Sequence, residues 1–333
     1  DNDTILLFSI ISYMNVFIKN RKRRVGEFQF FMHQFVESCI KSGIPPKRDF
    51  KINKLTKLLS IVFVKLPHRK KKNAIIISTQ GSSLLYNTYP YFGYEIIPMI
   101  WDLWPGTWPK LYRHLTKLKC KTAFVTVRSM AEKLRSDLGI NAYWISEGID
   151  VNDYSKGVAL ENRSIDVYEL GRQLPRYHNI LIKILGDKLI RNTYNPDGTL
   201  AKLAYPTSEE LLDKLNKTKI IISFPQVDTH PQRAGKLETL TQRYWEAMLS
   251  GCLIIGRAPK ELIDLVGYNP VIDVDWKNPE EQILNILNNI GSFQTFVDRN
   301  HDTAKKMASW DLRIQQIKNI LYDEGYLIGN VPQ

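Results

Sequence analysis

Residues 219–224 read KIIISF, and residues 239–256 read TLTQRYWEAMLSGCLIIG. The first stretch and residues 252–256 are continuous apolar runs rich in β-branched residues, which predict buried strands. The stretch between them predicts a helix over 239–250, and Gly251 stands where a glycine commonly ends a helix. A buried strand, a helix and a second buried strand make one unit of a parallel α/β sheet.

The same alternation of short apolar runs and amphipathic stretches extends along most of the chain. Further strands are predicted at 61–64, 74–77, 96–101, 122–127, 165–171, 188–194 and 271–276, and helices at 28–40, 108–119, 129–138, 279–289, 292–307 and 311–322. The 333 residues exceed one ordinary core, so we expect two Rossmann-like domains. Residues 1–150 and 151–333 form them, and we expect the last helix to pack back on the first domain.

The net charge of +12 is unevenly distributed. Residues 1–150 contain 24 Lys and Arg against 11 Asp and Glu, a net charge of +13. Two basic runs stand out, Lys19–Arg24 and Arg69–Lys72. They favour an anionic partner such as a membrane surface, although a solvated surface would explain either run alone. A nucleic acid is the weaker interpretation, because no aromatic residues are interleaved with the runs.

Several protein classes are disfavoured by what the sequence lacks. Its three cysteines, Cys39, Cys120 and Cys252, are too far apart for a zinc cage or a disulfide framework, which favours a reducing, cytoplasmic location. The apolar run Ile5–Ile18 is shorter than the roughly 20 residues of a membrane span. No P-loop, G-x-G-x-x-G or G-x-S-x-G motif is present, and no histidine spacing suggests a metal site.

Glu238 and Glu246 lie eight residues apart, and residues 247–251 continue as AMLSG. This arrangement resembles the E-x7-E element and the following helix of GT-B glycosyltransferases, especially glycosyltransferase family 4. The resemblance covers residues 95–325 and implies two Rossmann-like domains that face a central cleft. Three shorter resemblances support it in the same order along the chain: an interdomain turn at Glu147–Asp150, a strand end at Leu170–Arg172 and a late Ser309–Trp310.

The resemblance implies roles for three charged residues of the second domain. Glu246 would hold the hydroxyls of a nucleotide ribose, and Glu238 would contact the donor sugar. Arg172 would stabilise the leaving diphosphate where other enzymes use a metal ion. Each residue has a structural alternative: a solvent-facing helix glutamate, a loop charge and a surface arginine.

Further donor-binding candidates come from the same resemblance. The family places a lysine shortly after the arginine of the first donor-domain loop, but residues 176–178 contain none, so Arg176 is the substitute. Arg233 and Lys236 supply further cations in the loop before the first glutamate. His230 lies in that loop, where it would touch the sugar.

In the first domain, Gly81 and Ser82 follow a predicted strand and resemble the small-residue loop near the donor phosphates, or form a plain helix N-cap. Asp102 ends the strand at 96–101, where it would bind acceptor hydroxyls or act as the base of an inverting enzyme, or form an Asx turn. Trp101 stands where the family often has a histidine. Together with Trp104 and Trp108 it forms either a sugar-stacking surface or core.

The sequence therefore predicts a glycosyltransferase, of the hexosyltransferase class EC 2.4. It would move a sugar from a nucleotide-diphospho-sugar to a glycan or lipid-linked acceptor in cell-surface polysaccharide, lipopolysaccharide or glycolipid synthesis. The resemblance implies retention of configuration and no metal or other cofactor. The basic first half favours a cytoplasmic protein that is peripheral at the inner face of the membrane. Two alternatives stay open: a noncatalytic nucleotide-sugar-binding module of the same fold, and a basic nucleic-acid-binding α/β protein.

Overall fold

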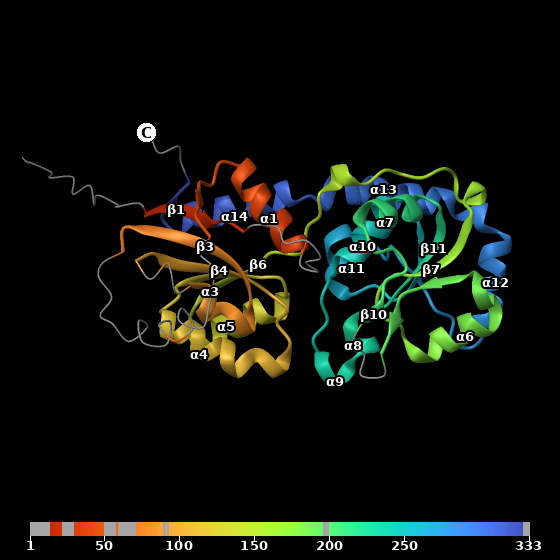
Figure 1. Ribbon diagram of the computed structural model, residues 1–333, viewed down its shortest axis with the longest axis horizontal. Helices are drawn as coiled ribbons and strands as arrows, with labels where there is room; N and C mark the ends of the chain where they lie inside the picture. Colours follow the sequence, from red (N-terminus) through yellow and green to blue (C-terminus); the bar gives the residue numbers. More distant parts are fainter. Residues whose placement is uncertain are drawn as a thin grey trace, which may run out of the picture.

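The computed structural model describes residues 14–21, 30–49, 58, 71–88, 91, 93–195 and 200–328, and Figure 1 shows their arrangement. Two parallel sheets lie side by side, one built mainly from the first half of the chain and one from the second. The predicted strand at 61–64 lies outside the described residues, as do residues 22–24 and 69–70 of the basic runs. Within the described residues no helix is long and apolar enough to cross a bilayer.

The first sheet is parallel throughout, in the order β14-β1-β3-β4-β5-β6 with β2 paired to β1. Its strands are β1 (Met14–Lys19), β2 (Pro46–Lys47), β3 (Asn73–Gln80), β4 (Glu95–Trp101), β5 (Thr122–Val125), β6 (Asn141–Trp144) and β14 (Tyr326–Leu327). Its helices are α1 (Phe30–Lys41), α3 (Leu84–Thr88), α4 (Trp108–Leu118), α5 (Arg128–Leu138) and α14 (Trp310–Asp323).

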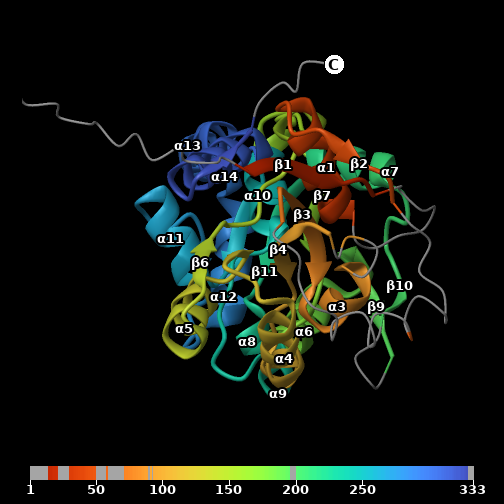
Figure 2. The same cartoon turned by 90° about the vertical axis from the view of Figure 1, so that its left-hand side faces the viewer.

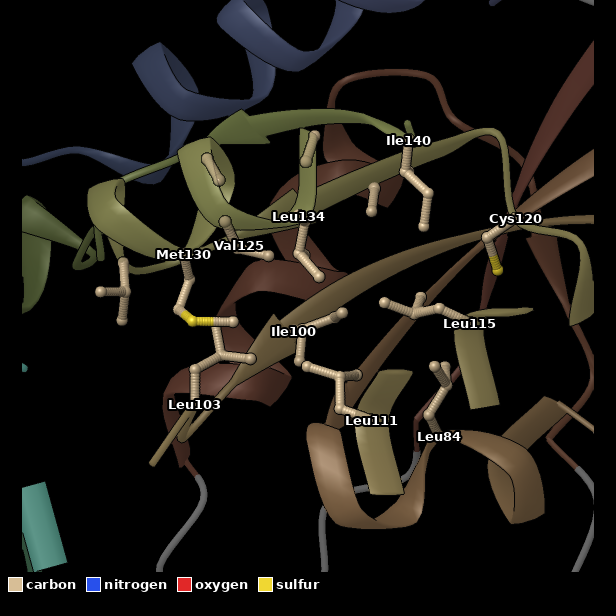
Figure 3. Close-up of a cluster of buried hydrophobic side chains, with 14 of the residues drawn as sticks. Leu84, Ile100, Leu103, Leu111, Leu115, Cys120, Val125, Met130, Leu134 and Ile140 are labelled. Carbon is tan, nitrogen blue, oxygen red and sulfur yellow. The ribbon is translucent and has the colours of Figure 1, made fainter. Parts of the chain in front are cut away.

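Alternating side chains of these strands enter two different cores, because successive residues of a strand point to opposite faces. Ile75 and Ile100 pack against α3, α4 and α5, in the cluster that Figure 3 shows. Ile76 and Trp101 pack on the opposite face against α1 and α14. Both faces are covered by helices, which is why the strands are continuously apolar.

The second sheet is also parallel, in the order β13-β12-β11-β7-β8. Its strands are β7 (Ile165–Glu169), β8 (Leu189–Arg191), β11 (Thr218–Ser223), β12 (Leu253–Gly256) and β13 (Ile272–Asp273), and β9 (Thr193–Tyr194) pairs antiparallel with β10 (Leu200–Lys202). The helices are α6 (Pro175–Leu185), α7 (Ser208–Asn216), α8 (Gln226–Thr229), α9 (Pro231–Ala234), α10 (Gln242–Leu249), α11 (Lys260–Val266), α12 (Pro279–Asn288) and α13 (Gln294–Met307).

Helices α10 and α13 cover one face of this sheet, and α6 and α12 cover the other. The strand at 219–224 and the glycine end of α10 agree with the sequence prediction, since Gly251 has a φ of +65°. Helix α10 begins at Gln242 and not at Thr239. The reason is a contact from α11: the Glu261 carboxylate accepts hydrogen bonds from the Leu240 N–H (2.9 Å) and the Thr239 hydroxyl (3.3 Å), which holds these residues outside the helix.

The last helix of the chain returns to the first sheet. Both views show α14 beside β1 and α1, although more than 250 residues separate them in sequence (Figures 1 and 2). Trp310 packs edge-on against Trp101 and Phe35, each with a ring-centroid distance of 5.5 Å. Residues 14–18 of the apolar run near the N-terminus belong to strand β1, which was not predicted from the sequence. Its alternate residues Val16 and Ile18 are buried in the core shared with α1 and α14.

Residues 148–149, which connect the two halves, lie against the start of α14. The Ile149 N–H donates to Ala308 O (2.9 Å), and the Trp310 N–H donates back to Ile149 O (3.2 Å). A Cβ at Gly148 would lie 2.8 Å from the Trp310 ring and 3.2 Å from Ala308 O. Glycine is therefore required here for close approach and not for an unusual φ.

We predict that Gly148→Ala lowers the free energy of unfolding by about 1–3 kcal/mol, because the added Cβ would clash with the buried Trp310 ring. Thermal unfolding measures this as a drop in Tm of several degrees. Gly106→Ala is the matched control, since a Cβ there meets nothing within 4 Å. Equal Tm values for the two variants would contradict the close contact at Trp310.

Candidate functional site

A cleft of about 830 Å³ lies between the carboxyl ends of the two sheets. Asp102, Thr126 and Glu147 line it from the segments that follow β4, β5 and β6. Arg172 and Asn192 line it from the opposite side, in the segments that follow β7 and β8. The carboxyl edge of a parallel sheet is where folds of this type bind ligands. Here two such edges face one another.

Three arginines, Arg172, Arg233 and Arg243, converge on this cleft together with His230. None of the three forms a salt bridge with another described residue of the chain. Burial, followed by the charges of the other two arginines, lowers the pKa of Arg172 to about 10. Burial and the same three cations also lower the pKa of His230. Although carboxyl groups also line the cleft, three arginines without an ion-pair partner among the described residues favour an anionic ligand.

Arg243 is positioned by a glycine on the facing loop. Gly171 has a φ of +97°, and a Cβ there would lie 2.1 Å from the Arg243 Nη1 atom. The guanidinium lies across this bare backbone and donates a hydrogen bond to Leu170 O (3.4 Å). Sequence reasoning identified the turn at 170–172 but missed Arg243, whose only signal is its place in the first turn of α10, between the two glutamates.

Glu246 lies one turn further along α10 and also lines the cleft. Its carboxylate accepts a hydrogen bond from the Tyr154 hydroxyl (3.2 Å). Burial raises the pKa of Glu246, while Arg243 and this hydrogen bond act in the opposite direction. The free acceptor capacity of the carboxylate faces the cleft, where it can receive hydroxyl donors.

Two carboxyl groups from the first half lie across from the arginines. Asp102 has a φ of +53°, a left-handed conformation that is uncommon outside glycine and concentrates at functional sites. Gln80 Nε2 donates to its Oδ2 atom at 2.7 Å. Glu147 Oε2 accepts from the Gln242 N–H at the start of α10 (3.2 Å). Burial, and then the charge of Asp102, raise the pKa of Glu147 to about 8, so this carboxyl is largely protonated at neutral pH.

A side cavity of about 190 Å³ shares Arg172, Tyr194 and His230 with the cleft and is also lined by His178. His178 Nδ1 lies 2.5 Å from an oxygen of the buried Glu169. This pairing orients the imidazole in the region where sequence reasoning expected a lysine. His178 was not selected from the sequence, because only the fold brings it beside Glu169.

The remaining predicted site residues lie elsewhere. Glu238 and Arg176 line a second cavity of about 770 Å³, and none of the described residues lines both this cavity and the cleft. Lys236 is exposed and lines neither of the two. Gly81 is buried, and a Cβ there would lie 3.6 Å from Ile100, so it belongs to the first core; neither it nor Ser82 lines the cleft.

The three tryptophans divide between the two alternatives that the sequence left open. Trp108 packs against the first core, where its Nε1 donates to Leu103 O (2.7 Å), and it does not line the cleft. Trp101 is fully buried beneath α14, and its Nε1 donates to the Ser78 hydroxyl (2.9 Å), so it is core. Trp104 is largely buried but lines the cleft, with Arg233 5.5 Å above its ring. In the described part of the chain, no group of three or more His, Cys, Asp or Glu side chains is arranged to hold a metal ion.

Several solved structures share this arrangement, glycosyltransferases among them. Anabaena Alr3699/HepE in complex with UDP-glucose superposes with a TM-score of 0.56 at 13% identity, over 93% of this chain and 100% of that one. Sucrose-phosphate synthase from Thermosynechococcus elongatus gives 0.57 at 14% identity, over 94% and 99% of the two chains. The protein has the GT-B fold. AviGT4, a glycosyltransferase involved in avilamycin A biosynthesis, matches this GT-B chain with a TM-score of 0.56 at 11% identity, over 93% and 98%.

No protein-family model matches the sequence, and no curated protein matches it. At 11–14% identity, the structural matches establish the GT-B fold of the chain. The assignment of individual residues therefore depends on the geometry of the cleft.

We predict that Glu147→Gln raises Tm at pH 8 and that the gain shrinks towards pH 4.5. The unfolded chain releases this proton near the ordinary pKa of 4.5, whereas the folded protein keeps it up to about pH 8. The stability contributed by the protonated group is therefore full below pH 4.5 and is lost as the pH rises to about 8. Glutamine avoids that loss because it does not ionise.

Differential scanning fluorimetry across this pH range makes the comparison. Glu132→Gln, on the exposed face of α5, serves as the control and should follow the wild type at every pH. A constant difference between Glu147→Gln and the wild type over the whole range would show that Glu147 is ionised in the folded protein.

Proposed function

We propose that the protein is a glycosyltransferase that moves a sugar from a nucleoside-diphosphate sugar, bound by the second half, to an acceptor bound by the first. The observation that carries this proposal is the convergence of Arg172, Arg233 and Arg243 on a cleft that also contains Glu246. A diphosphate supplies the anion that the arginines lack, and a ribose supplies the hydroxyls that the carboxylate can accept. The bound UDP-glucose of HepE, a protein of the same fold, supports this choice of donor class.

The nucleoside would lie at the β8 side of the cleft. Asn192 and Tyr194 line that side, together with Leu200 and Leu203 beyond β9. A phenol ring and two aliphatic side chains offer an apolar surface for a planar base. Glu246 is the acceptor that would hold the ribose hydroxyls between the base and the arginines.

The cations would act on the leaving group. As the bond between the anomeric carbon and the diphosphate oxygen breaks, negative charge builds on that oxygen. Arg172 and Arg243 are already in place, and no reorganisation is needed to stabilise this charge. A metal ion is then not required for this step, so metal independence remains our prediction.

The acceptor would enter from the first half, where Asp102 is held in its left-handed conformation. We propose retention of configuration: the acceptor hydroxyl oxygen bonds to the anomeric carbon on the side from which the diphosphate leaves, and the hydroxyl proton passes to a diphosphate oxygen. Asp102 then orients the hydroxyl and does not act as a base. Glu147, protonated at neutral pH, is a hydrogen-bond donor here and not a base.

A lipid-linked acceptor at the anionic inner face of a membrane fits the net charge of +13 on residues 1–150. Lys19 does not contribute an exposed charge, because it is largely buried and pairs with Asp49 (3.4 Å). Lys72 is exposed and remains available. We place the reaction in cell-surface polysaccharide, lipopolysaccharide or glycolipid synthesis on this basis.

A thermal-shift screen with UDP-, GDP-, CMP- and dTDP-sugars tests the proposal. A donor present at 100 times its Kd stabilises the folded state by about 2.7 kcal/mol, which is a shift of several degrees. We predict that UDP-sugars stabilise the wild type, and that Glu246→Ala removes most of the shift because the ribose contact is lost.

Glu132→Ala is the control for this screen, since that side chain is exposed on α5, away from the cleft. It should keep the full shift. If no nucleotide sugar stabilises the wild type while oligonucleotides do, the glycosyltransferase proposal fails and a nucleic-acid-binding protein takes its place. Stabilisation by a nucleotide sugar, without any transfer of the sugar to glycans or lipids, would indicate a noncatalytic nucleotide-sugar-binding module.

A further inference from the structure

The second cavity lies at the carboxyl ends of β11, β12 and β13, on a different part of the sheet from the cleft. Its volume of about 770 Å³ is close to that of the cleft. This size falls within the range of roughly 300–1,000 Å³ that is usual for small-molecule sites. The segment 226–239 forms a shared wall, because Gln226 and Thr239 line the cleft while Asp228 and Glu238 line the second cavity.

The polar side of this cavity is a fixed network of matched charges. Arg257 forms a bidentate pair with Asp228, through Nε to Oδ2 at 2.7 Å and Nη2 to Oδ1 at 2.9 Å. Its remaining nitrogen, Nη1, donates to Glu238. The Lys260 N–H donates to the other oxygen of Glu238 at 3.1 Å. These groups are preorganised, and their remaining lone pairs and N–H bonds can serve a ligand without a change in net charge.

The apolar side of the cavity is an aromatic wall. Trp276 is 38% exposed, although its ring is held by Tyr177 (centroids 5.9 Å apart, 75°) and Phe224 (6.5 Å, 33°). The Arg176 guanidinium lies 4.5 Å from the Trp276 ring centroid. A large indole kept in place yet open to solvent is a surface on which the apolar face of a ligand can stack.

The two cavities differ in the charge that they would accept. In the cleft, three arginines lack an anionic partner, so an anionic ligand is favoured. In the second cavity, the central arginine is already ion-paired with two carboxylates, so a charged ligand would break existing pairs. The favoured ligand is neutral, carries many hydroxyl groups and has an apolar face. Sugars have this chemistry.

We propose that the second cavity binds neutral oligosaccharide, with one sugar ring stacked on Trp276 and its hydroxyls hydrogen-bonded to the Asp228–Arg257–Glu238 network. The role of this site as a holder of the glycan that the cleft would extend rests on the proposed function. The binding of oligosaccharide to this cavity does not depend on that function. Arg176 and Glu238, which sequence reasoning assigned to the donor, belong to this site.

Titration calorimetry with three neutral trisaccharides, maltotriose, cellotriose and triacetylchitotriose, tests the proposal. We expect at least one to bind the wild type. Trp276→Ala should weaken that binding by about tenfold or more, because both the contact area and the stacking are removed. Trp276→Phe, which keeps an aromatic ring, should retain most of the affinity. Tyr322→Ala, an exposed aromatic on α14, is the control and should bind like the wild type.

Unfolding midpoints of the four proteins confirm that each is folded before it is titrated. The proposal is overturned if none of the three trisaccharides binds, or if Trp276→Ala binds as tightly as the wild type. A parallel titration with UDP separates the two proposals: Trp276→Ala should bind UDP like the wild type. Trisaccharide binding without any UDP binding would support the oligosaccharide site and would contradict the glycosyltransferase proposal.

Discussion

The packing of Trp310 against Trp101 and Phe35 is the contact on which the arrangement of this molecule depends. It ties the last helix of the chain to the first sheet, beneath β4, the strand that precedes Asp102. The backbone of residues 148–149 is held against the same helix, so the connection between the two halves has little freedom at this point. Helix α10 starts beside it, with its first N–H bonded to Glu147. The carboxyl edges of both sheets are thereby kept facing one cleft.

The cleft brings several positive charges close together, which is unfavourable in the free protein. Burial, and then repulsion from Arg243 and Arg233, lower the pKa of Arg172. Groups that weaken the free protein in this way are retained where a ligand repays the cost on binding. The second cavity differs, since Arg257 forms ion pairs with both Asp228 and Glu238. The contrast between unpaired and paired arginines, in two cavities of similar size, is the basis on which we propose a diphosphate for one and a neutral ligand for the other.

The sequence predicted the two α/β halves well, because continuous apolar strands and a helix such as α10 carry local signals. Glu246, which was selected through the family resemblance, lines the cleft from α10. Side chains on loops were less predictable: Glu238 turns towards Arg257 and away from Glu246, and spacing along the chain does not determine that direction. Glu147 was recognised only as part of a turn, because its proton depends on burial between elements that are far apart in sequence.

A calorimetric comparison of UDP with uridine, at two salt concentrations, tests the central claim most directly. If the arginines hold a diphosphate, UDP should bind at least about a hundredfold more tightly than uridine, since charge-assisted hydrogen bonds to several cations contribute a few kcal/mol. The difference should shrink at higher salt and should largely disappear in Arg172→Gln combined with Arg243→Gln. Equal binding of UDP and uridine, or an unchanged preference in the double variant, would contradict the account.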